Sequence, residues 1–179
     1  MCSSDLGGAT DVAVRASSDV VSQALGQPFV IENRPGASGA IAAEAVMKSP
    51  ADGYTLLATA DVMASAPHLF KLNFDPFRDF APVVQLTVQP IVLAVHPSLG
   101  VSTVAEFVAY AKQKPGLAYA TSGAGSQQHF TAEWFASLAG LKMTHIPYKG
   151  GGPAIVDLVA GQVQVGSLGS TPVMVHKRA

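Results

Sequence analysis

Charged side chains are scarce in this sequence. Lys, Arg, Asp and Glu make up 13% of its 179 residues, about half of the ~25% that is usual in soluble domains. Eleven Lys and Arg against twelve Asp and Glu leave a net charge of −1. Since no basic stripe stands out, nucleic acid is not an expected partner. No apolar run reaches ~18 residues, so no membrane-spanning helix is predicted.

Cysteine is almost absent. Cys2 is the single cysteine, which excludes an internal disulfide and a cysteine-based metal site. The histidines do not predict a metal site either, because His68, His96, His145 and His176 share no metal-ligand spacing with one another or with acidic residues. We therefore expect neither a metal nor a cofactor.

The first six residues lack the features of a secretory signal. Residues 1–6 have no basic start, no long apolar core and no cleavage site. They do not read as a full strand. We interpret them as a leader or cloning scar that is foreign to the rest of the chain.

The most informative stretch is a glycine turn. The apolar run 117–121 predicts a strand, Gly123 and Gly125 follow it, and Ser126 opens a helical pattern. Glycine lets backbone N–H groups approach a ligand closely, and the first N–H groups of a helix lack intrahelical partners at its positive end. The turn therefore predicts an anion seat, with no Lys or Arg, which favours a carboxylate over a phosphate. Three side chains add neutral donors: Ser122, Ser126 and Gln127.

Taken alone, this turn is not specific. It is not a phosphate-binding loop of the G-x-x-x-x-G-K-[ST] type, and it matches only the first half of G-x-G-x-x-G because residue 128 is Gln. A plain strand-to-helix connection with Ser126 as the N-cap explains it equally well. The turn by itself leaves both interpretations open.

The remaining pattern alternates helices and short strands, which predicts a parallel sheet covered by helices. A first helix is capped by Thr10 or Asp11 and stops at Gly26, and a capping box at Thr103 and Glu106 opens another. Apolar runs at 83–88 and 91–95 are separated by Pro90, which breaks a strand or confines it to an edge. Further strands are expected at 29–32, 54–58, 143–146 and 162–167, and further helices at 41–47 and 154–160.

Strand-to-helix junctions recur at both ends of the chain. They occur at 7–11, 59–61, 122–129 and 169–172, on either side of a crossover near 96–102. In open α/β sheets, ligands bind beyond the carboxyl ends of strands at such junctions. Two sets of junctions predict two lobes that face a cleft.

Seven sequence words, in order, give the chain a family resemblance. It resembles the substrate-binding proteins of tripartite tricarboxylate transporters, also called Bug receptors. The words are GGATD at 7–11, LGQP at 25–28, ENRPGA at 32–37, PADGYTL at 50–56, DFAPV at 79–83, GAGSQQH at 123–129 and PYKG at 147–150.

This resemblance implies an α/β, two-lobed fold of the periplasmic-binding-protein type (type II), truncated at both ends. Lobe 1 would span residues 7–98, without its first strand and its C-terminal return, and an incomplete lobe 2 would span residues 99–179. The family implies a periplasmic monomer that captures a small carboxylate, a di- or tricarboxylate or related acid, for a membrane permease. The implied ligand-binding residues are Gly8, Ala9, Thr10 and Asp11 in lobe 1, Ser122, Ser126, Gln127 and His129 in lobe 2, and additionally Thr59 and Tyr148.

The chain departs from the family pattern near its last junction. Many members carry an Asp or Asn there that can reach a ligand amine or hydroxyl, whereas residues 167–170 read Ser-Leu-Gly-Ser. This disfavours an amino-bearing ligand.

Several candidate residues also have purely structural interpretations. Asp11 can serve as a helix N-cap, and His129, expected to be neutral in a first helical turn, can brace the loop instead of touching a ligand. Tyr148 can belong to a solvated loop, and Arg34 can brace a loop or the lobes. Phe130, Trp134, Phe135 and Leu138 fall on one helical face, where Trp134 and Phe135 are expected to pack in the core.

Two other functions compete with a transport receptor. The glycine turns could serve an α/β enzyme as an oxyanion or phosphate site, but the sequence has no G-x-S-x-G elbow and no paired carboxylates near the turns. A sensor that docks on a receptor kinase would use the same closed lobes. The sequence does not separate that role from transport.

Overall fold

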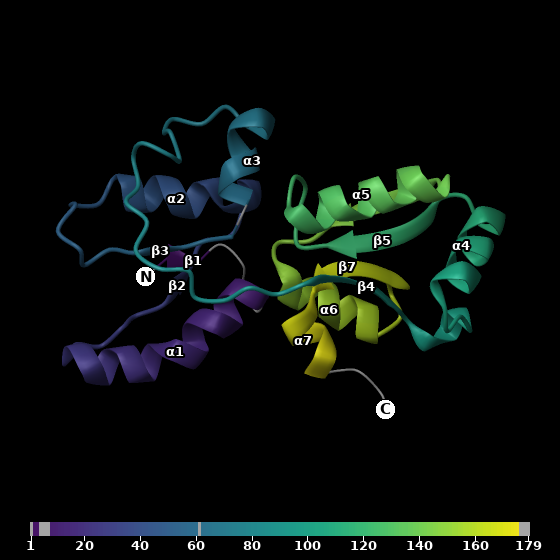
Figure 1. The fold of residues 1–179 in the computed structure, drawn as a ribbon, viewed down its shortest axis with the longest axis horizontal. Coiled ribbons are helices and arrows are strands. Elements are labelled where there is room, and N and C mark those ends of the chain that lie inside the picture. Colours follow the sequence, from purple (N-terminus) through teal and green to yellow (C-terminus); the bar gives the residue numbers. More distant parts are fainter. Residues whose placement is uncertain (1, 4–7, 61, 176–179) are drawn as a thin grey trace.

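The computed structural model describes residues 2–3, 8–60 and 62–175, which form two α/β units that lie side by side (Figure 1). The first unit contains β1 to β3 and α1 to α3, and the second contains β4 to β7 and α4 to α7. No helix among the described residues is long and apolar enough to cross a membrane. The elements of the first unit are β1 (Cys2–Ser3), α1 (Ala9–Leu25), β2 (Glu32–Asn33), the 3-10 helix η1 (Ala37–Gly39), α2 (Ala40–Met47), β3 (Leu57–Ala58) and α3 (Val62–Leu69).

The first unit is built on a small parallel sheet in the order β2-β1-β3. Helices α1 and α2 lie on opposite sides of it (Figure 1). Cys2 pairs with Glu32 on one side and with Leu57 on the other. Residues 2 and 3 thus form a short strand that was not expected. The interpretation of residues 1–6 as foreign to the chain stays a prediction, because strand pairing does not test their origin. The strand was not predicted because two residues are too short to show an alternating pattern.

The strands predicted at 29–32 and 54–58 are shorter in the structure, where β2 is Glu32–Asn33 and β3 is Leu57–Ala58. The run 83–88 forms no strand. Residues 70–90 contain neither a helix nor a strand. The aromatic part of this segment is organised by Phe74 and Phe80, whose rings meet edge to face with centroids 5.6 Å apart. The side chains of Val83, Val84 and Val88 are exposed, so this apolar run lacks the packing that a buried strand would have.

The second unit has a four-stranded sheet in the order β4-β7-β5-β6. Strands β5, β6 and β7 run parallel, as predicted, and β4 joins the edge antiparallel to β7. The division of the chain at residue 98 remains a prediction, but β4, which it assigns to lobe 1, is hydrogen-bonded in this second sheet. The elements are β4 (Ile91–Val95), the 3-10 helix η2 (Pro97–Leu99), α4 (Val104–Gln113), β5 (Leu117–Thr121), α5 (Gln127–Ala139), β6 (Met143–Pro147), α6 (Gly151–Val159), β7 (Val165–Gly169) and α7 (Ser170–Val175).

Two apolar cores sandwich the second sheet. Tyr119 packs in the core shared with α4 and α5, whereas its neighbour Ala120 packs against α6 on the opposite face. Successive side chains of a strand point to opposite faces, so β5 is buried on both sides. Its carboxyl end, where the glycine turn begins, is therefore fixed from both faces.

Most predicted helix ends are confirmed. Thr103 and Glu106 form the capping box of α4, the hydroxyl of Ser126 caps α5, and Gly26 ends α1 in the left-handed conformation. The predicted cap of α1 is wrong, because Gly8 is its N-cap and no side chain caps it. Thr10 and Asp11 instead lie inside the first turn. Helix α6 begins at Gly151, three residues before the predicted start.

The predicted core face of α5 is also wrong in part. Phe135 packs against the core, but Trp134 is 70% exposed and Leu138 is 77% exposed. The helix instead buries Ala132 and Ala136 against the sheet. Small side chains let the helix approach the strands closely, so its larger apolar residues point outward.

Candidate functional site

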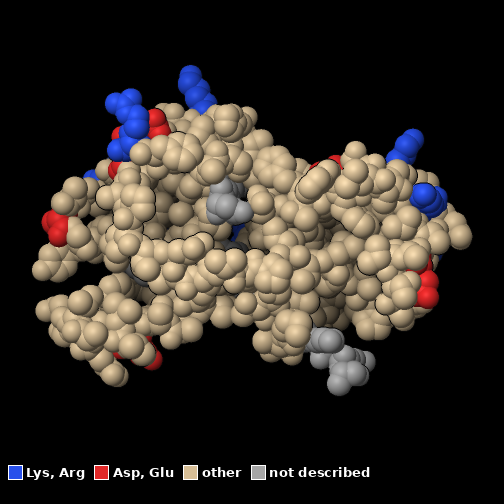
Figure 2. Space-filling view, viewed as in Figure 1, with Lys and Arg blue, Asp and Glu red and all other residues tan. Residues whose placement is uncertain are grey.

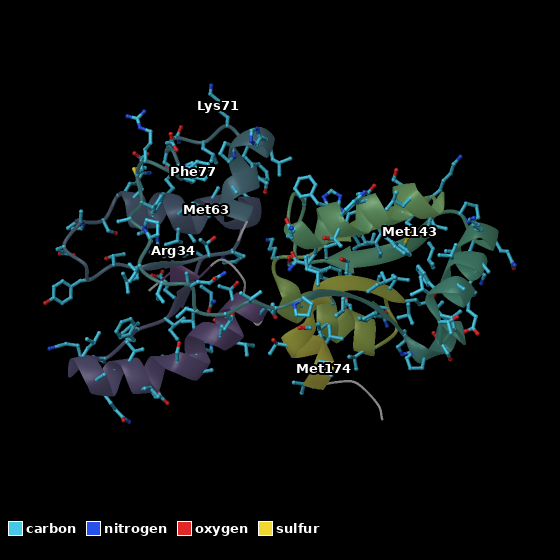
Figure 3. The ribbon with its side chains drawn as sticks, viewed as in Figure 1. Arg34, Met63, Lys71, Phe77, Met143 and Met174 are labelled. Atoms are coloured by element: carbon cyan, nitrogen blue, oxygen red, sulfur yellow. The ribbon has the colours of Figure 1, made fainter. Side chains whose placement is uncertain are left out.

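One cavity of about 1410 Å³ is lined by residues of both units. Its wall in the first unit is largely apolar and includes Met63, which is labelled in Figure 3. Among its described lining residues, two are charged, Asp79 and Lys149. Figure 2 shows most Lys, Arg, Asp and Glu side chains at the outer margins of this face. Six of the predicted ligand-binding residues line the cavity: Thr10, Thr59, Ser122, Ser126, Gln127 and Tyr148.

Two helix N-termini, one from each unit, meet this cavity. Thr10 lies in the first turn of α1, and Gln127 is the first residue of α5. Both helix starts point toward the region between the units (Figure 1). The first N–H groups of each helix have no intrahelical acceptor, and each N-terminus carries a partial positive charge. The cavity therefore has two electropositive ends without requiring a Lys or Arg.

Contacts between the units hold these two ends in place. A Cβ on Gly169, at the end of β7, would lie 3.0 Å from the Cβ of Ala9, at the start of α1. A Cβ on Gly125 would lie 2.6 Å from Cδ1 of Leu69, at the end of α3. Glycine at these positions lets the chain segments approach closely. Ala9 is thus a buried contact residue that does not line the cavity. Its neighbour Gly8 is also buried and does not line the cavity either.

The glycine turn uses its own N–H groups internally. The Gly123 N–H donates to Thr121 Oγ1 at 3.2 Å, and the Gly125 N–H donates to His129 Nδ1 at 3.2 Å. The Ser126 hydroxyl donates to the Gly123 carbonyl at 2.7 Å. The expectation that glycine N–H groups face a ligand is therefore corrected. The donors available toward the cavity are then the first N–H groups of α5, because the Ser122 hydroxyl donates to Gln128.

Sequence reasoning did not identify Gln128 as part of the site. Its side-chain Oε1 accepts from the Ser122 hydroxyl at 3.0 Å, and its carbonyl accepts from the Ser167 hydroxyl at 2.9 Å. Gln128 also lines the cavity. Its place at the second position of α5, next to an unpartnered first turn, is the local feature that could have suggested it.

His129 braces the turn and does not line the cavity. Its Nδ1 accepts from Gly125, and its ring stacks on His145 of β6 with centroids 3.9 Å apart. His145, which the sequence did not single out, also lies 2.7 Å from Thr121 Oγ1 through Nε2. Burial, reinforced by the neighbouring His129, lowers the pKa of His145 to about 4, against the opposing effect of Glu133. His145 is therefore neutral at pH 7.

Asp11 has a structural role in the first unit. The residue is 4% exposed, and its carboxylate accepts hydrogen bonds from Arg15 Nε at 3.0 Å and from Asn33 Nδ2 at 2.9 Å. Arg15 Nη2 also donates to Asn33 Oδ1 at 2.9 Å. This triad ties the start of α1 to β2, and Asp11 does not line the cavity. Arg34, labelled in Figure 3, lies in the first unit and pairs with Glu32 at 2.8 Å.

Tyr148 lines the cavity, but its hydroxyl is engaged elsewhere. The hydroxyl donates to Asp157 Oδ2 at 2.6 Å, and burial together with this bond raises the pKa of Tyr148 to about 12. The Tyr148 N–H donates to the Thr121 carbonyl, and the Gly150 N–H donates to the Ser122 carbonyl. The loop after β6 is thus attached to the glycine turn. Within the described residues, no group of three or more His, Cys, Asp or Glu side chains could hold a metal ion.

Residues 13–177 match the tripartite tricarboxylate transporter family receptor, TctC. The chain belongs to this family. It is 38% identical to BugT of Bordetella pertussis over 177 residues, which cover 97% of the chain and 54% of BugT. The chain thus spans about half the length of this relative.

Solved structures of TctC relatives share the fold. Rpa4515 of R. palustris, solved with adipate, matches with a TM-score of 0.91 and 37% identity over 98% of this chain and 61% of its own. MatC of Rhodopseudomonas palustris, solved with bound malate, matches with a TM-score of 0.85 and 30% identity over 97% of this chain and 61% of its own. The two-unit arrangement described above is therefore that of a periplasmic binding protein.

Proposed function

We propose that this chain carries the ligand-binding part of a solute receptor that captures a small dicarboxylate or related organic acid. The carrying observation is that the N-termini of α1 and α5, from different units, share one cavity with Thr10, Ser122 and Gln127. Relatives with the same fold were solved with adipate and with malate. A non-catalytic role is part of this proposal.

Electrostatics favour a dicarboxylate in such a cavity. A helix N-terminus stabilises a nearby anion by about 0.3–1 kcal/mol, and by up to ~2 kcal/mol where the site is partly buried. Two helix ends can each hold one carboxylate of a short diacid. Neutral hydroxyl and amide donors then supply hydrogen bonds to the charged oxygens, at about 1.5–3 kcal/mol each. Lys149 is the one cation among the described lining residues, so binding rests mainly on neutral donors.

Within the complete protein, the receptor role implies a membrane partner and a location. The family is that of tripartite tricarboxylate transporter receptors. The proposal therefore includes a periplasmic location and delivery of the bound acid to the permease subunits of such a transporter.

Titration calorimetry with adipate and with malate tests the proposal on the purified chain. Adipamide, a neutral analogue of adipate, is the ligand control. We expect heat and a raised melting temperature with a dicarboxylate and neither with adipamide, because a ligand that binds only the folded state stabilises it. A cooperatively folded chain that responds to neither acid would contradict the proposal.

A single backbone donor can be removed to locate the site. Gln127→Pro deletes the N–H at the first position of α5, where proline fits a helix, and Ser126 already has the extended conformation (φ −71°, ψ 159°) that a residue before proline prefers. We expect a loss of about tenfold in affinity for the dicarboxylate. Gln127→Ala separates the loss of the side chain from the loss of the N–H.

The matched control is Val104→Pro at the first position of α4. Its N-cap Thr103 is also extended (φ −127°, ψ 158°), and α4 starts outside the cavity lining. This variant removes an equivalent N–H and is expected to leave dicarboxylate affinity unchanged. Equal affinities of the Gln127→Pro and Gln127→Ala variants would exclude this N–H from the site.

A further inference from the structure

Two histidines outside the cavity lining terminate the hydrogen bonds of the glycine turn. The Gly125 N–H ends on Nδ1 of His129. The Gly123 N–H ends on Thr121 Oγ1, which lies 2.7 Å from Nε2 of His145. The two rings stack with a 3.9 Å centroid separation and a 12° interplanar angle. The two glycines of the turn are therefore connected to one pair of imidazoles.

The surroundings of this histidine pair fix its geometry. Tyr119 of β5 stacks on His145 with centroids 5.1 Å apart, and its hydroxyl donates to Glu133 of α5. Glu133 Oε1 lies 4.0 Å from Nε2 of His129. Phe130 of α5 stacks on His129 from 6.2 Å. Among the described residues, Tyr119 from β5 and Glu133 from α5 are thus the titratable groups that face the pair.

We propose that His129 and His145 are positioning residues that hold the glycine turn, and with it the start of α5, in the shape that binds a carboxylate. This inference rests on the function proposed above. Glycine loses more conformational freedom on ordering than any other residue. Without hydrogen bonds that hold Gly123 and Gly125, the ligand would have to order the turn when it binds. The entropy lost in this step would weaken the affinity. The histidine pair removes that cost before the ligand arrives.

The brace requires the acceptor nitrogen of His129 to be unprotonated. Protonation would turn Nδ1 into a donor that faces the donor N–H of Gly125, so the hydrogen bond would be lost. His129 therefore acts on the turn through its acceptor nitrogen, so the test must compare side chains that keep this acceptor with side chains that displace it.

Paired isosteric variants test the role of each ring. His129→Asn keeps an acceptor near the position of Nδ1, whereas His129→Gln places it near Nε2. We expect Gly125 amide exchange to accelerate about tenfold in His129→Gln, as a lost hydrogen bond of ~1.4 kcal/mol implies, and to be rescued in His129→Asn. By the same geometry, His145→Gln should preserve the contact with Thr121 and His145→Asn should lose it. His68→Gln, at an exposed site on α3, is the control.

The second readout is adipate affinity at pH 7.5. We expect His129→Gln to bind adipate severalfold more weakly than His129→Asn, because only His129→Asn keeps an acceptor for the Gly125 N–H. Equal affinities of the two variants, or equal Gly125 exchange in them, would overturn the positioning role.

These readouts separate the two proposals. Faster Gly125 exchange in His129→Gln, in a chain that binds neither adipate nor malate, would support the brace and overturn the proposed function. Normal adipate binding with unchanged Gly125 exchange in His129→Gln would support the proposed function and overturn the brace.

Discussion

The imidazole rings of His129 and His145 stack face to face, with centroids 3.9 Å apart and planes 12° apart. His129 lies in the first turn of α5 and His145 lies on β6. The stack therefore joins the helix whose N-terminus faces the cavity to the strand beside it. Because burial and His129 lower the pKa of His145 to about 4, this junction is sensitive to acid.

We expect the free energy of unfolding to decrease as the pH falls from 7 to 4.5. An unfolded histidine has a pKa of about 6.5, so between pH 6.5 and 4 the unfolded chain binds a proton that folded His145 does not. Stability then falls with pH, by roughly 2 kcal/mol from this residue over the full window once partial exposure is allowed for. Urea unfolding at pH 7 and pH 4.5 measures the change.

His145→Gln removes the titrating ring and should flatten this pH dependence, whereas His68→Gln should preserve it because His68 is exposed on α3. Carboxylates other than Glu133, which interacts with His145, contribute equally to all three proteins and cancel in the comparison. Parallel pH profiles for wild type and His145→Gln would refute the assignment.

Gly125 and Gly140 provide a matched test of the contact between the units. Both have positive φ angles, 75° and 64°, but a Cβ on Gly125 would lie 2.6 Å from Leu69 Cδ1, whereas nothing lies within 4 Å of one on Gly140. Gly140→Ala should cost about 1 kcal/mol of stability, from the left-handed backbone alone. Gly125→Ala should cost ~1 kcal/mol more, since Leu69 must move. Equal losses of unfolding free energy in the two variants would show that the contact between Gly125 and Leu69 does not contribute to stability.

Asp11 should stabilise the fold far more than a surface ion pair does. Its buried carboxylate accepts from Arg15 and Asn33, so Asp11→Ala leaves these donors without that acceptor and should cost about 2–3 kcal/mol. Lys48→Ala removes the exposed pair with Glu44 and should leave the free energy of unfolding nearly unchanged. Urea unfolding of both variants gives the comparison, and similar losses would contradict the structural role of Asp11.

Local patterns predicted several strands and helix ends of the second unit correctly. The strand β5, the cap at Ser126 and the capping box at Thr103 were all predictable, because each depends on residues within a few positions of one another. The glycine turn was located, but the partners of its N–H groups were not. His145 is sixteen positions after His129, and the two meet only because β5 and β6 pair in parallel, with Tyr119 opposite His145.

Burial was the least predictable property. The first strand was missed because Cys2 and Ser3 carry no alternating pattern. The apolar run 83–88, where Pro90 was expected to break a strand or confine it to an edge, forms no strand. In both cases the outcome depends on which neighbouring strands are available. A run of apolar residues indicates a preference for burial, but it does not specify which surface of the protein will cover it.

The two faces of α5 lead to the last prediction. Phe135 packs on the core beside Phe107, with ring centroids 6.2 Å apart, whereas Trp134 is 70% exposed. Phe135→Ala should therefore cost about 2–3 kcal/mol, somewhat less than a fully buried Phe, and Trp134→Ala should cost no more than ~0.5 kcal/mol. Urea unfolding followed by circular dichroism measures both losses. The emission of Trp134, the only tryptophan, should also be that of a solvated indole. A blue-shifted emission, or a Trp134→Ala loss as large as that of Phe135→Ala, would place the helix in the opposite orientation, with its large apolar face against the sheet.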